Sequence, residues 1–145
     1  MNIRRYFSEE EKLQIINAIR VAEGETSGEI RVHIEKYCKG MVLDRAAYLF
    51  EQLKMHQTKL RNGVLFYLAI EDRKFGVIGD VGINAKVAEN FWDEIKENVL
   101  KNFSDGRKAE GITEGILKAG EQLKQHFPHQ TDDVNELPDE ISFGD

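Results

Sequence analysis

Val64-Leu65-Phe66-Tyr67-Leu68-Ala69-Ile70 is the longest strongly apolar run in this chain of 145 residues. An uninterrupted apolar run of this length is typical of a strand that is covered on both faces, as in a sheet that lies between helices. It is far shorter than the roughly 20 residues that a membrane-spanning helix needs. We therefore expect residues 64–70 to form the central strand of a sheet inside a folded domain.

The segments on either side of this run predict two further strands. Residues 74–78 follow after the short polar turn 71–73, so they should pair with 64–70 as an antiparallel hairpin. Residues 30–35 alternate apolar and polar side chains, which indicates a strand with one buried face. Because a helical segment separates 30–35 from 64–70, these two strands should be parallel, with a right-handed crossover.

Apolar side chains that recur every three or four residues predict four helices around these strands. The helices cover residues 8–23, residues 42–57, a segment that Asn84 caps, and residues 106–126. The first helix begins with the capping-box spacing of Ser8 and Glu11. The order of elements predicts an α/β fold, namely a three-layer α/β/α sandwich around a small mixed β-sheet.

Charge is unevenly distributed along the chain. The net charge is −6, from 26 acidic and 20 basic residues, but six acids and no Lys or Arg lie in 129–145. We therefore expect one charge-balanced domain over 1–128 and an acidic tail over 129–145. A balanced domain lacks the basic excess of nucleic-acid binders. Leu137, Ile141 and Phe143 indicate that the tail docks on the domain, for example over loops at one end; a disordered terminus is the alternative.

No signal for export is expected in this sequence. The first seven residues run directly into Ser8-Glu9-Glu10-Glu11 without the apolar stretch of a signal peptide. The single cysteine, Cys38, allows no internal disulfide and fits a reducing compartment. We therefore expect a soluble, cytoplasmic monomer that binds neither membranes nor nucleic acids.

Three predicted loops, 25–29, 61–63 and 79–84, lie at the same end of the predicted sheet, which we call the loop end. Their oxygen-bearing side chains include three carboxylates and two amides: Glu25, Glu29, Asp80, Asn62 and Asn84. Calcium and magnesium prefer oxygen ligands of this kind. The loop end is therefore a predicted divalent-cation site, with solvated surface carboxylates as the alternative.

Four segments of the chain also carry a resemblance to a known family. They are Thr26-Ser27-Gly28-Glu29-Ile30-Arg31-Val32, Arg61-Asn62-Gly63-Val64-Leu65-Phe66-Tyr67-Leu68-Ala69, Asp72-Arg73-Lys74 and Gly79-Asp80-Val81-Gly82-Ile83. With these segments the chain resembles the TPM-domain family over residues 8–127, as a soluble bacterial type. The resemblance implies a sheet between helices and divalent-metal binding by the loops. It also implies a metal-assisted acid phosphatase as an alternative, because one family member is described as an acid phosphatase.

These expectations combine into one functional hypothesis. A divalent cation, Ca²⁺ more than Mg²⁺, is expected to bind through Glu25, Glu29 and Asp80, with Asn62 and Asn84 as further ligands. The alternatives are a phosphomonoesterase that uses the same loops, with unknown catalytic residues, and a metal-ordered adaptor for a protein partner. The family segment that matches 61–63 often begins with Asp, so Arg61 replaces an acidic ligand here and becomes a candidate phosphate ligand.

Overall fold

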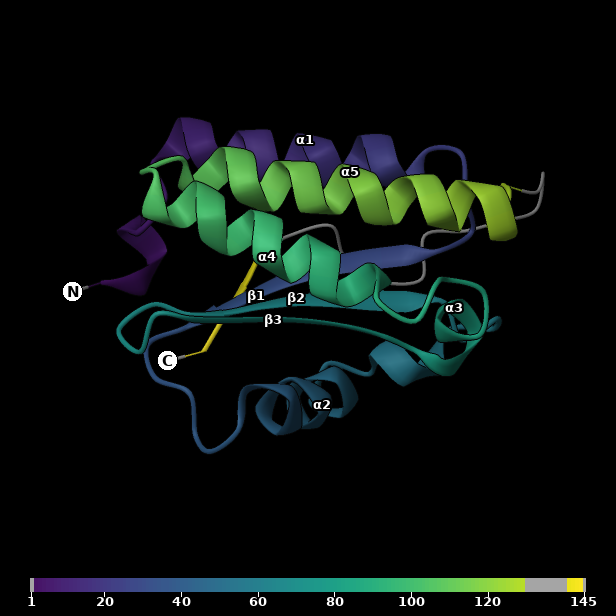
Figure 1. Ribbon diagram of the computed structural model, residues 1–145, viewed down its shortest axis with the longest axis horizontal. Coiled ribbons are helices and arrows are strands. Elements are labelled where there is room, and N and C mark those ends of the chain that lie inside the picture. The colour runs from purple at the N-terminus through teal and green to yellow at the C-terminus, as the bar shows by residue number, and fades with distance from the viewer. Residues whose placement is uncertain (1, 130–140, 145) are drawn as a thin grey trace.

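The computed structural model describes residues 2–129 and 141–144, whose elements form three layers (Figure 1). The middle layer is a four-stranded sheet in the order β3-β2-β1-β4. Its strands are β1 (Glu29–Glu35), β2 (Gly63–Ala69), β3 (Lys74–Gly79) and β4 (Ser142–Phe143). The helices α1 (Glu9–Glu23), α4 (Phe91–Ser104) and α5 (Lys108–His126) cover one face, and α2 (Val42–Gln52) covers the other. The predicted α/β/α sandwich is confirmed.

Strand β2 is central in the sheet, and each of its residues is buried. It pairs with β1 in parallel, from Gly63 opposite Glu29, and with β3 in antiparallel orientation, from Val64 opposite Gly79. Its alternate side chains enter two cores. Phe66 belongs to the larger core under α1, α4 and α5, whereas Tyr67 belongs to the smaller core that α2 covers. The uninterrupted apolar pattern therefore has the predicted cause.

Two predicted helices differ from the observed ones. The predicted helix over 42–57 ends at Gln52, because Lys54 adopts a left-handed conformation with φ of 60° and the chain continues as the short 3₁₀ helix η2 (Met55–Gln57). Asn84 does not cap a long helix. Asp80 caps the four-residue helix α3 (Val81–Asn84), which Asn84 ends, and α4 begins only at Phe91.

Strand β1 was expected to have one buried face, and this expectation is wrong. Its apolar side chains lie in the larger core, but Glu29, His33 and Glu35 on the opposite face are only 2%, 5% and 6% exposed. Hydrogen bonds to Glu35 and to Nδ1 of His33, described below, compensate part of the loss of water.

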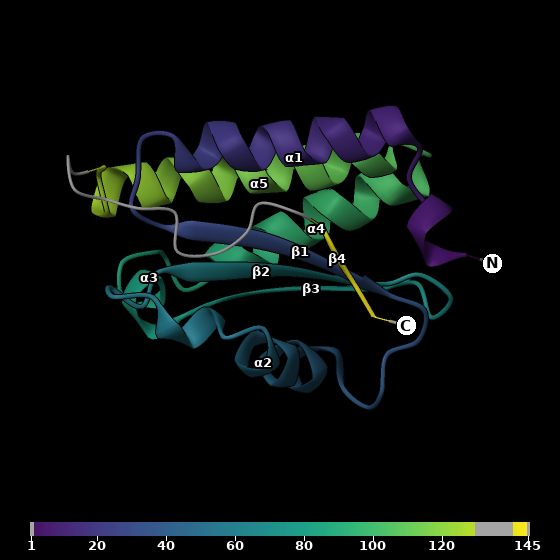
Figure 2. The same ribbon diagram turned by 180° about the vertical axis from the view of Figure 1, so that it is seen from behind.

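The N-terminal and C-terminal segments also pack on this domain. The 3₁₀ helix η1 (Ile3–Arg5) precedes α1, whose start forms the predicted capping box between Ser8 and Glu11. Ile141 is buried, and β4 pairs in parallel with β1 opposite His33 and Ile34, away from the loop end (Figure 2). Leu137 lies outside the described residues. Within 2–129 and 141–144, no helix combines the length and apolarity needed to cross a membrane.

Candidate cation site at the loop end

The sheet topology brings three of the predicted ligands together. Glu29 begins β1, Asn62 precedes β2, and Asp80 follows β3. The backbone N–H of Glu29 donates to the carbonyl oxygen of Asn62 at 3.4 Å, and that of Asp80 donates to the carbonyl oxygen of Gly63 at 2.9 Å. The three residues therefore lie on adjacent chain segments at one end of the sheet, beside α3 (Figure 1).

All three side chains are almost completely buried, with exposed fractions of 2% for Glu29, 1% for Asn62 and 6% for Asp80. The amide Nδ2 of Asn62 donates to Ser27 Oγ at 3.2 Å. Its oxygen Oδ1, by contrast, has no hydrogen-bond partner within the described part of the chain. An acceptor buried in this way costs roughly 1–3 kcal/mol, so it indicates a place where a ligand can supply the missing partner.

Asp80 is held by an arginine from the neighbouring loop. Arg61 Nε donates to Oδ2 of Asp80 at 2.7 Å, and Arg61 Nη2 donates to Oδ1 at 2.9 Å. The same Oδ1 accepts from the backbone N–H of Val81 and caps α3. The hydrogen bonds to Asp80 raise the pKa of Arg61. A cationic side chain thus already neutralises the carboxylate that a metal ion would use.

The loop that carries Arg61 depends on a glycine in α3. The backbone N–H of Gly82 donates to the carbonyl oxygen of Arg61 at 2.8 Å. A Cβ atom at position 82 would lie 2.2 Å from the carbonyl oxygen of Leu60 and 2.5 Å from that of Arg61. Since neither backbone atom can move without displacing the loop, only glycine permits this close approach.

The other two predicted ligands have partners outside this group. Glu25 is largely exposed and forms an ion pair with Lys124 at 2.5 Å, which lowers the pKa of Glu25. Asn84 is exposed, and its Oδ1 accepts from Trp92 Nε1 at 2.7 Å. The described residues contain no cluster of three or more His, Cys, Asp or Glu side chains placed to hold a metal. A cation at this end therefore needs amide, hydroxyl, main-chain or water oxygens as well.

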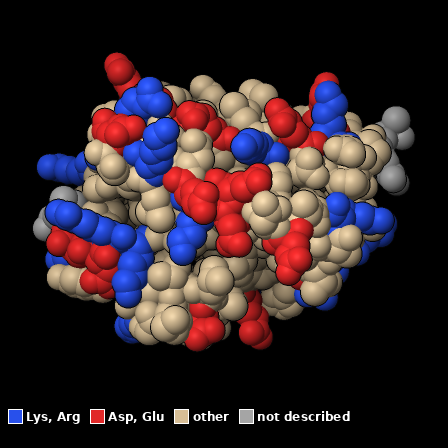
Figure 3. Space-filling model, viewed as in Figure 1, with Lys and Arg blue, Asp and Glu red and all other residues tan. Residues whose placement is uncertain are grey.

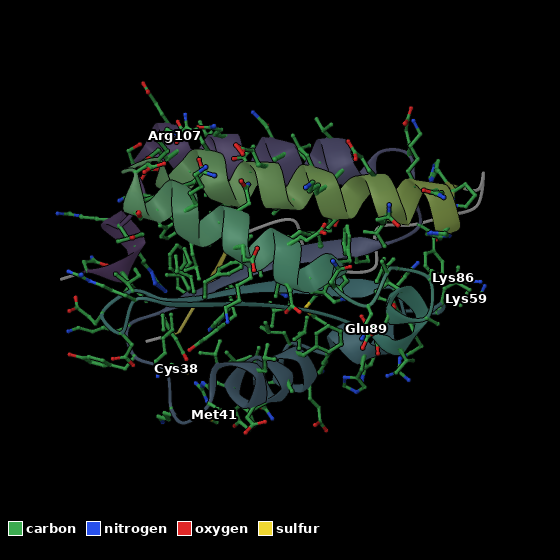
Figure 4. All side chains as sticks on the ribbon, viewed as in Figure 1. Cys38, Met41, Lys59, Lys86, Glu89 and Arg107 are labelled. Carbon is green, nitrogen blue, oxygen red and sulfur yellow. The ribbon has the colours of Figure 1, made fainter. Side chains whose placement is uncertain are left out.

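Two exposed lysines lie at the loop end. Lys59 and Lys86 project from this end of the molecule, close to Glu89 in the view of Figure 4. Their positive charge opposes the binding of a cation through space, although solvent and salt screen exposed charges. The two lysines therefore oppose part of the attraction that the carboxylates of Glu29 and Asp80 exert on a cation.

A second polar cluster, which we call the β1 network, lies at the other end of β1 and was not predicted. Glu35 accepts hydrogen bonds from Arg45 Nε at 2.9 Å, from Arg45 Nη2 at 2.8 Å and from the hydroxyl of Tyr67. His33 Nδ1 lies 2.6 Å from Ser142 Oγ of β4. The sequence gives one signal for it, the polar residues on alternate positions of β1, but that pattern equally indicates an exposed face.

Burial and pairing shift the pKa values within this network. Burial alone would raise the pKa of Glu35, but hydrogen bonds from Arg45 and Tyr67 outweigh it, and the pKa is lowered. Burial and the hydrogen bond to Glu35 raise the pKa of Tyr67. For His33, burial is the largest cause of a pKa lowered to about 4, and Glu35 opposes the shift only in part. His33 is therefore neutral near pH 7.

Two of three comparisons with known proteins found matches. The TPM domain matches residues 3–122 of the chain. A search of curated proteins gave no match. Among solved structures, the chain is 47% identical to the BA42 protein of the psychrophilic bacterium Bizionia argentinensis, with a TM-score of 0.89 and 99% of each chain covered.

Two further solution structures share the fold at lower identity. The N-terminal domain of a protein from P. gingivalis is 21% identical, with a TM-score of 0.70, 87% of this chain and 83% of that chain covered. The N-terminal domain of a protein from Corynebacterium glutamicum is 14% identical, with a TM-score of 0.64 and coverages of 90% and 82%. Since the domain match extends over most of the sequence, the chain belongs to the TPM-domain family.

Proposed function

We propose that the loop end binds a divalent cation, calcium in preference to magnesium, through Glu29, Asn62 and Asp80. The observation that carries this proposal is the buried Asn62 Oδ1, an acceptor without a hydrogen-bond partner in the described residues. It lies on a chain segment next to two buried carboxylates. Carboxylate and amide oxygens are ligands that hard cations accept.

The donor set supports weak rather than tight binding. Calcium takes six to eight oxygen ligands, and the affinity falls as the number of charged ligands falls. Two carboxylates and one amide leave several positions for Ser27 Oγ, main-chain carbonyl oxygens and water. We therefore expect a dissociation constant of roughly 10⁻⁴–10⁻³ M, as in other low-affinity calcium sites.

Cation binding also requires that Arg61 release Asp80. The guanidinium contacts both carboxylate oxygens, so it competes directly with a metal for the same ligand. Its side chain is 47% exposed and can turn towards solvent, whereas that of Asp80 is only 5% exposed and stays in place. Binding is therefore an exchange of one positive charge for another at Asp80.

Titration of the chelator-treated protein with CaCl₂ and MgCl₂, followed by backbone amide shifts, tests this proposal. We expect saturable shifts in residues 27–29, 61–63 and 79–82, and a dissociation constant at least about tenfold weaker for Glu29→Gln and Asp80→Asn. Glu25→Gln is the matched control, because Glu25 is exposed and paired with Lys124. The absence of saturable shifts at millimolar metal, or equal weakening by all three variants, would contradict the proposed ligand set.

A phosphomonoesterase is the second candidate, and the half-exposed Arg61 beside buried carboxylates favours it. A bound cation would supply Lewis-acid polarisation of a phosphoryl oxygen, and Arg61 would orient the phosphate by charge-assisted hydrogen bonds. Hydrolysis of p-nitrophenyl phosphate in the presence of calcium or magnesium tests it. Turnover should disappear in Asp80→Asn and fall strongly in Arg61→Gln; a rate unaffected by either substitution would exclude this site as its source.

A further inference from the structure

A cavity of about 660 Å³ lies at the end of the sheet opposite the loop end. It is bordered by the end of β2, the start of β3 and the C-terminal part of α4. The length of β2 separates it from the cation site by roughly 20 Å, at about 3.3 Å per residue. The cavity is therefore independent of the proposed cation site.

The walls of the cavity are partly apolar and partly polar. Its lining includes two strand side chains that are almost completely buried, Leu68 at 3% and Phe75 at 2% exposed, and the α4 side chains Leu100 and Phe103. Its volume falls within the range of small-molecule sites, about 300–1,000 Å³. When an apolar group of a ligand packs against these apolar side chains, both surfaces are removed from water, and this lowers the free energy of the complex.

The mouth of the cavity carries more positive than negative charge. Arg73 lines it from the turn between β2 and β3, and Lys74 lines it from the start of β3, together with one acid, Glu71. Within residues 2–129 and 141–144, neither basic side chain takes part in a hydrogen bond or ion pair with another residue. In Figure 3, basic and acidic side chains lie next to one another at the end of the molecule where this hairpin lies.

Tyr6 adds a polar group to the same opening. Lys108 Nζ donates to its backbone carbonyl at 3.0 Å and lies 3.9 Å from the centroid of its ring, which fixes the tyrosine beside the cavity. Burial raises the pKa of Tyr6, and the nearby Arg73 only partly offsets this. The phenol is therefore protonated near pH 7 and can donate a hydrogen bond to an anionic ligand.

We propose that this cavity binds an organic monocarboxylate with an apolar body. The body fills the space between Leu68, Phe75 and Leu100, and the carboxylate meets Arg73 and Lys74 at the mouth. Two cations against one acid leave one net positive charge, which matches a single carboxylate. The planar guanidinium of Arg73 suits a carboxylate in particular, because it can donate two parallel hydrogen bonds.

Titrations followed by backbone amide shifts test this proposal. The ligands are decanoate and 1-naphthylacetate, and each is compared with the alcohol that carries the same apolar group. We expect saturable shifts in residues 68–75 and 100–104, with each carboxylate binding at least about fivefold more tightly than its alcohol. Arg73→Gln should remove this preference. Lys54→Gln is the matched control, since Lys54 is also an exposed cation with a positive φ, at 60° against 52° for Arg73.

A second pair of variants tests the apolar part. Leu100→Trp fills the cavity and should abolish the shifts, whereas Leu117→Trp on α5 should leave them unchanged; both leucines are 38% exposed. Amide signals that stay unchanged outside the cavity show that both variants are folded. The proposal would be overturned if neither carboxylate bound at millimolar concentration. It would also be overturned if the shifts survived Leu100→Trp, or if acids and alcohols bound equally well. None of these results bears on the cation site.

Discussion

Strand β1 carries a polar cluster at each end, and the two clusters differ in how their polar groups are compensated. In the β1 network, Glu35 accepts three hydrogen bonds, and Arg45 and Tyr67 donate them. At the loop end, Asn62 keeps a buried oxygen without a partner in the described residues. The carboxylate of Glu35 is thus satisfied within the protein, although Nε2 of the neighbouring His33 has no hydrogen-bond partner among the described residues. Satisfied buried groups stabilise the fold, whereas an unsatisfied buried acceptor is a place that a ligand can complete.

The largest effect should come from Glu35→Ala, which distinguishes the stabilising cluster from the proposed cation site. Removing Glu35 leaves Arg45 and Tyr67 without their acceptor, so we expect a loss of about 3–5 kcal/mol in the free energy of unfolding. Asn62→Ala should cost less than about 1 kcal/mol, because the loss of one hydrogen bond at 3.2 Å is offset by removal of the buried oxygen without a partner in the described residues. Urea unfolding measures both, with Glu51→Ala on the exposed face of α2 as the control. Equal losses for positions 35 and 62 would remove the distinction.

The next effect is a dependence of stability on pH through His33. Its pKa is about 4 in the folded protein against 6.5 in the unfolded chain, so the unfolded chain binds a proton first as the pH falls. The contribution of His33 is complete above pH 6.5 and is lost towards pH 4, and the loss at pH 4.5 reaches about 2.5 kcal/mol.

Urea unfolding near neutral pH and at about pH 4.5 measures this loss. His33→Gln should remove that part of the dependence, while His126→Gln, at the end of α5, should keep it. Because the lowered pKa of Glu35 acts in the same direction, the difference between the wild type and His33→Gln isolates the histidine. Identical pH profiles for these two proteins would contradict the assignment to His33.

The third effect concerns the loop end, where Arg61→Gln should raise the affinity for calcium about tenfold. The substitution removes the positive charge that holds both oxygens of Asp80, so the cation no longer has to displace it. Calcium titration followed by amide shifts measures the change. Lys59→Gln is the control, because Lys59 is an exposed cation at the same end without a described contact to Asp80. Unchanged affinity in Arg61→Gln would mean that Asp80 is not a ligand.

The smallest effect is expected from Ser142→Ala, which tests whether β4 belongs to the β1 network. Loss of the hydrogen bond between Ser142 Oγ and His33 Nδ1, at 2.6 Å, should cost about 1 kcal/mol. A double-mutant cycle with His33→Gln should give a coupling energy of similar size. Additive losses in the cycle would show that the two side chains stabilise the protein independently.

The fold could be predicted from local patterns, because each pattern had a simple physical cause. The run 64–70 is apolar on both faces since helices cover both faces of β2, and the alternation in 30–35 correctly indicated a strand. The same alternation could not show that Glu35 is buried. That depends on Arg45 and Tyr67, which reach it only through the tertiary fold.

The candidate site was predictable in place but not in detail. Loop positions relative to the strands brought Glu29, Asn62 and Asp80 to one end, as expected from topology. The pairing of Arg61 with Asp80 and of Glu25 with Lys124 depends on side-chain geometry, which spacing does not encode. The cavity beside Phe75 was missed for the same reason, since its walls come from segments far apart in the sequence.

The parallel pairing of β4 with β1 has a consequence for synthesis of the chain. His33 and Ser142 are 109 positions apart, so the outer edge of β1 cannot form this pair until residues 142–143 have left the ribosome. Until then, the edge of β1 at His33 and Ile34 lacks this partner, and an unpaired strand edge can pair with another chain. This two-residue strand therefore covers part of a sheet edge only after most of the domain has been synthesised.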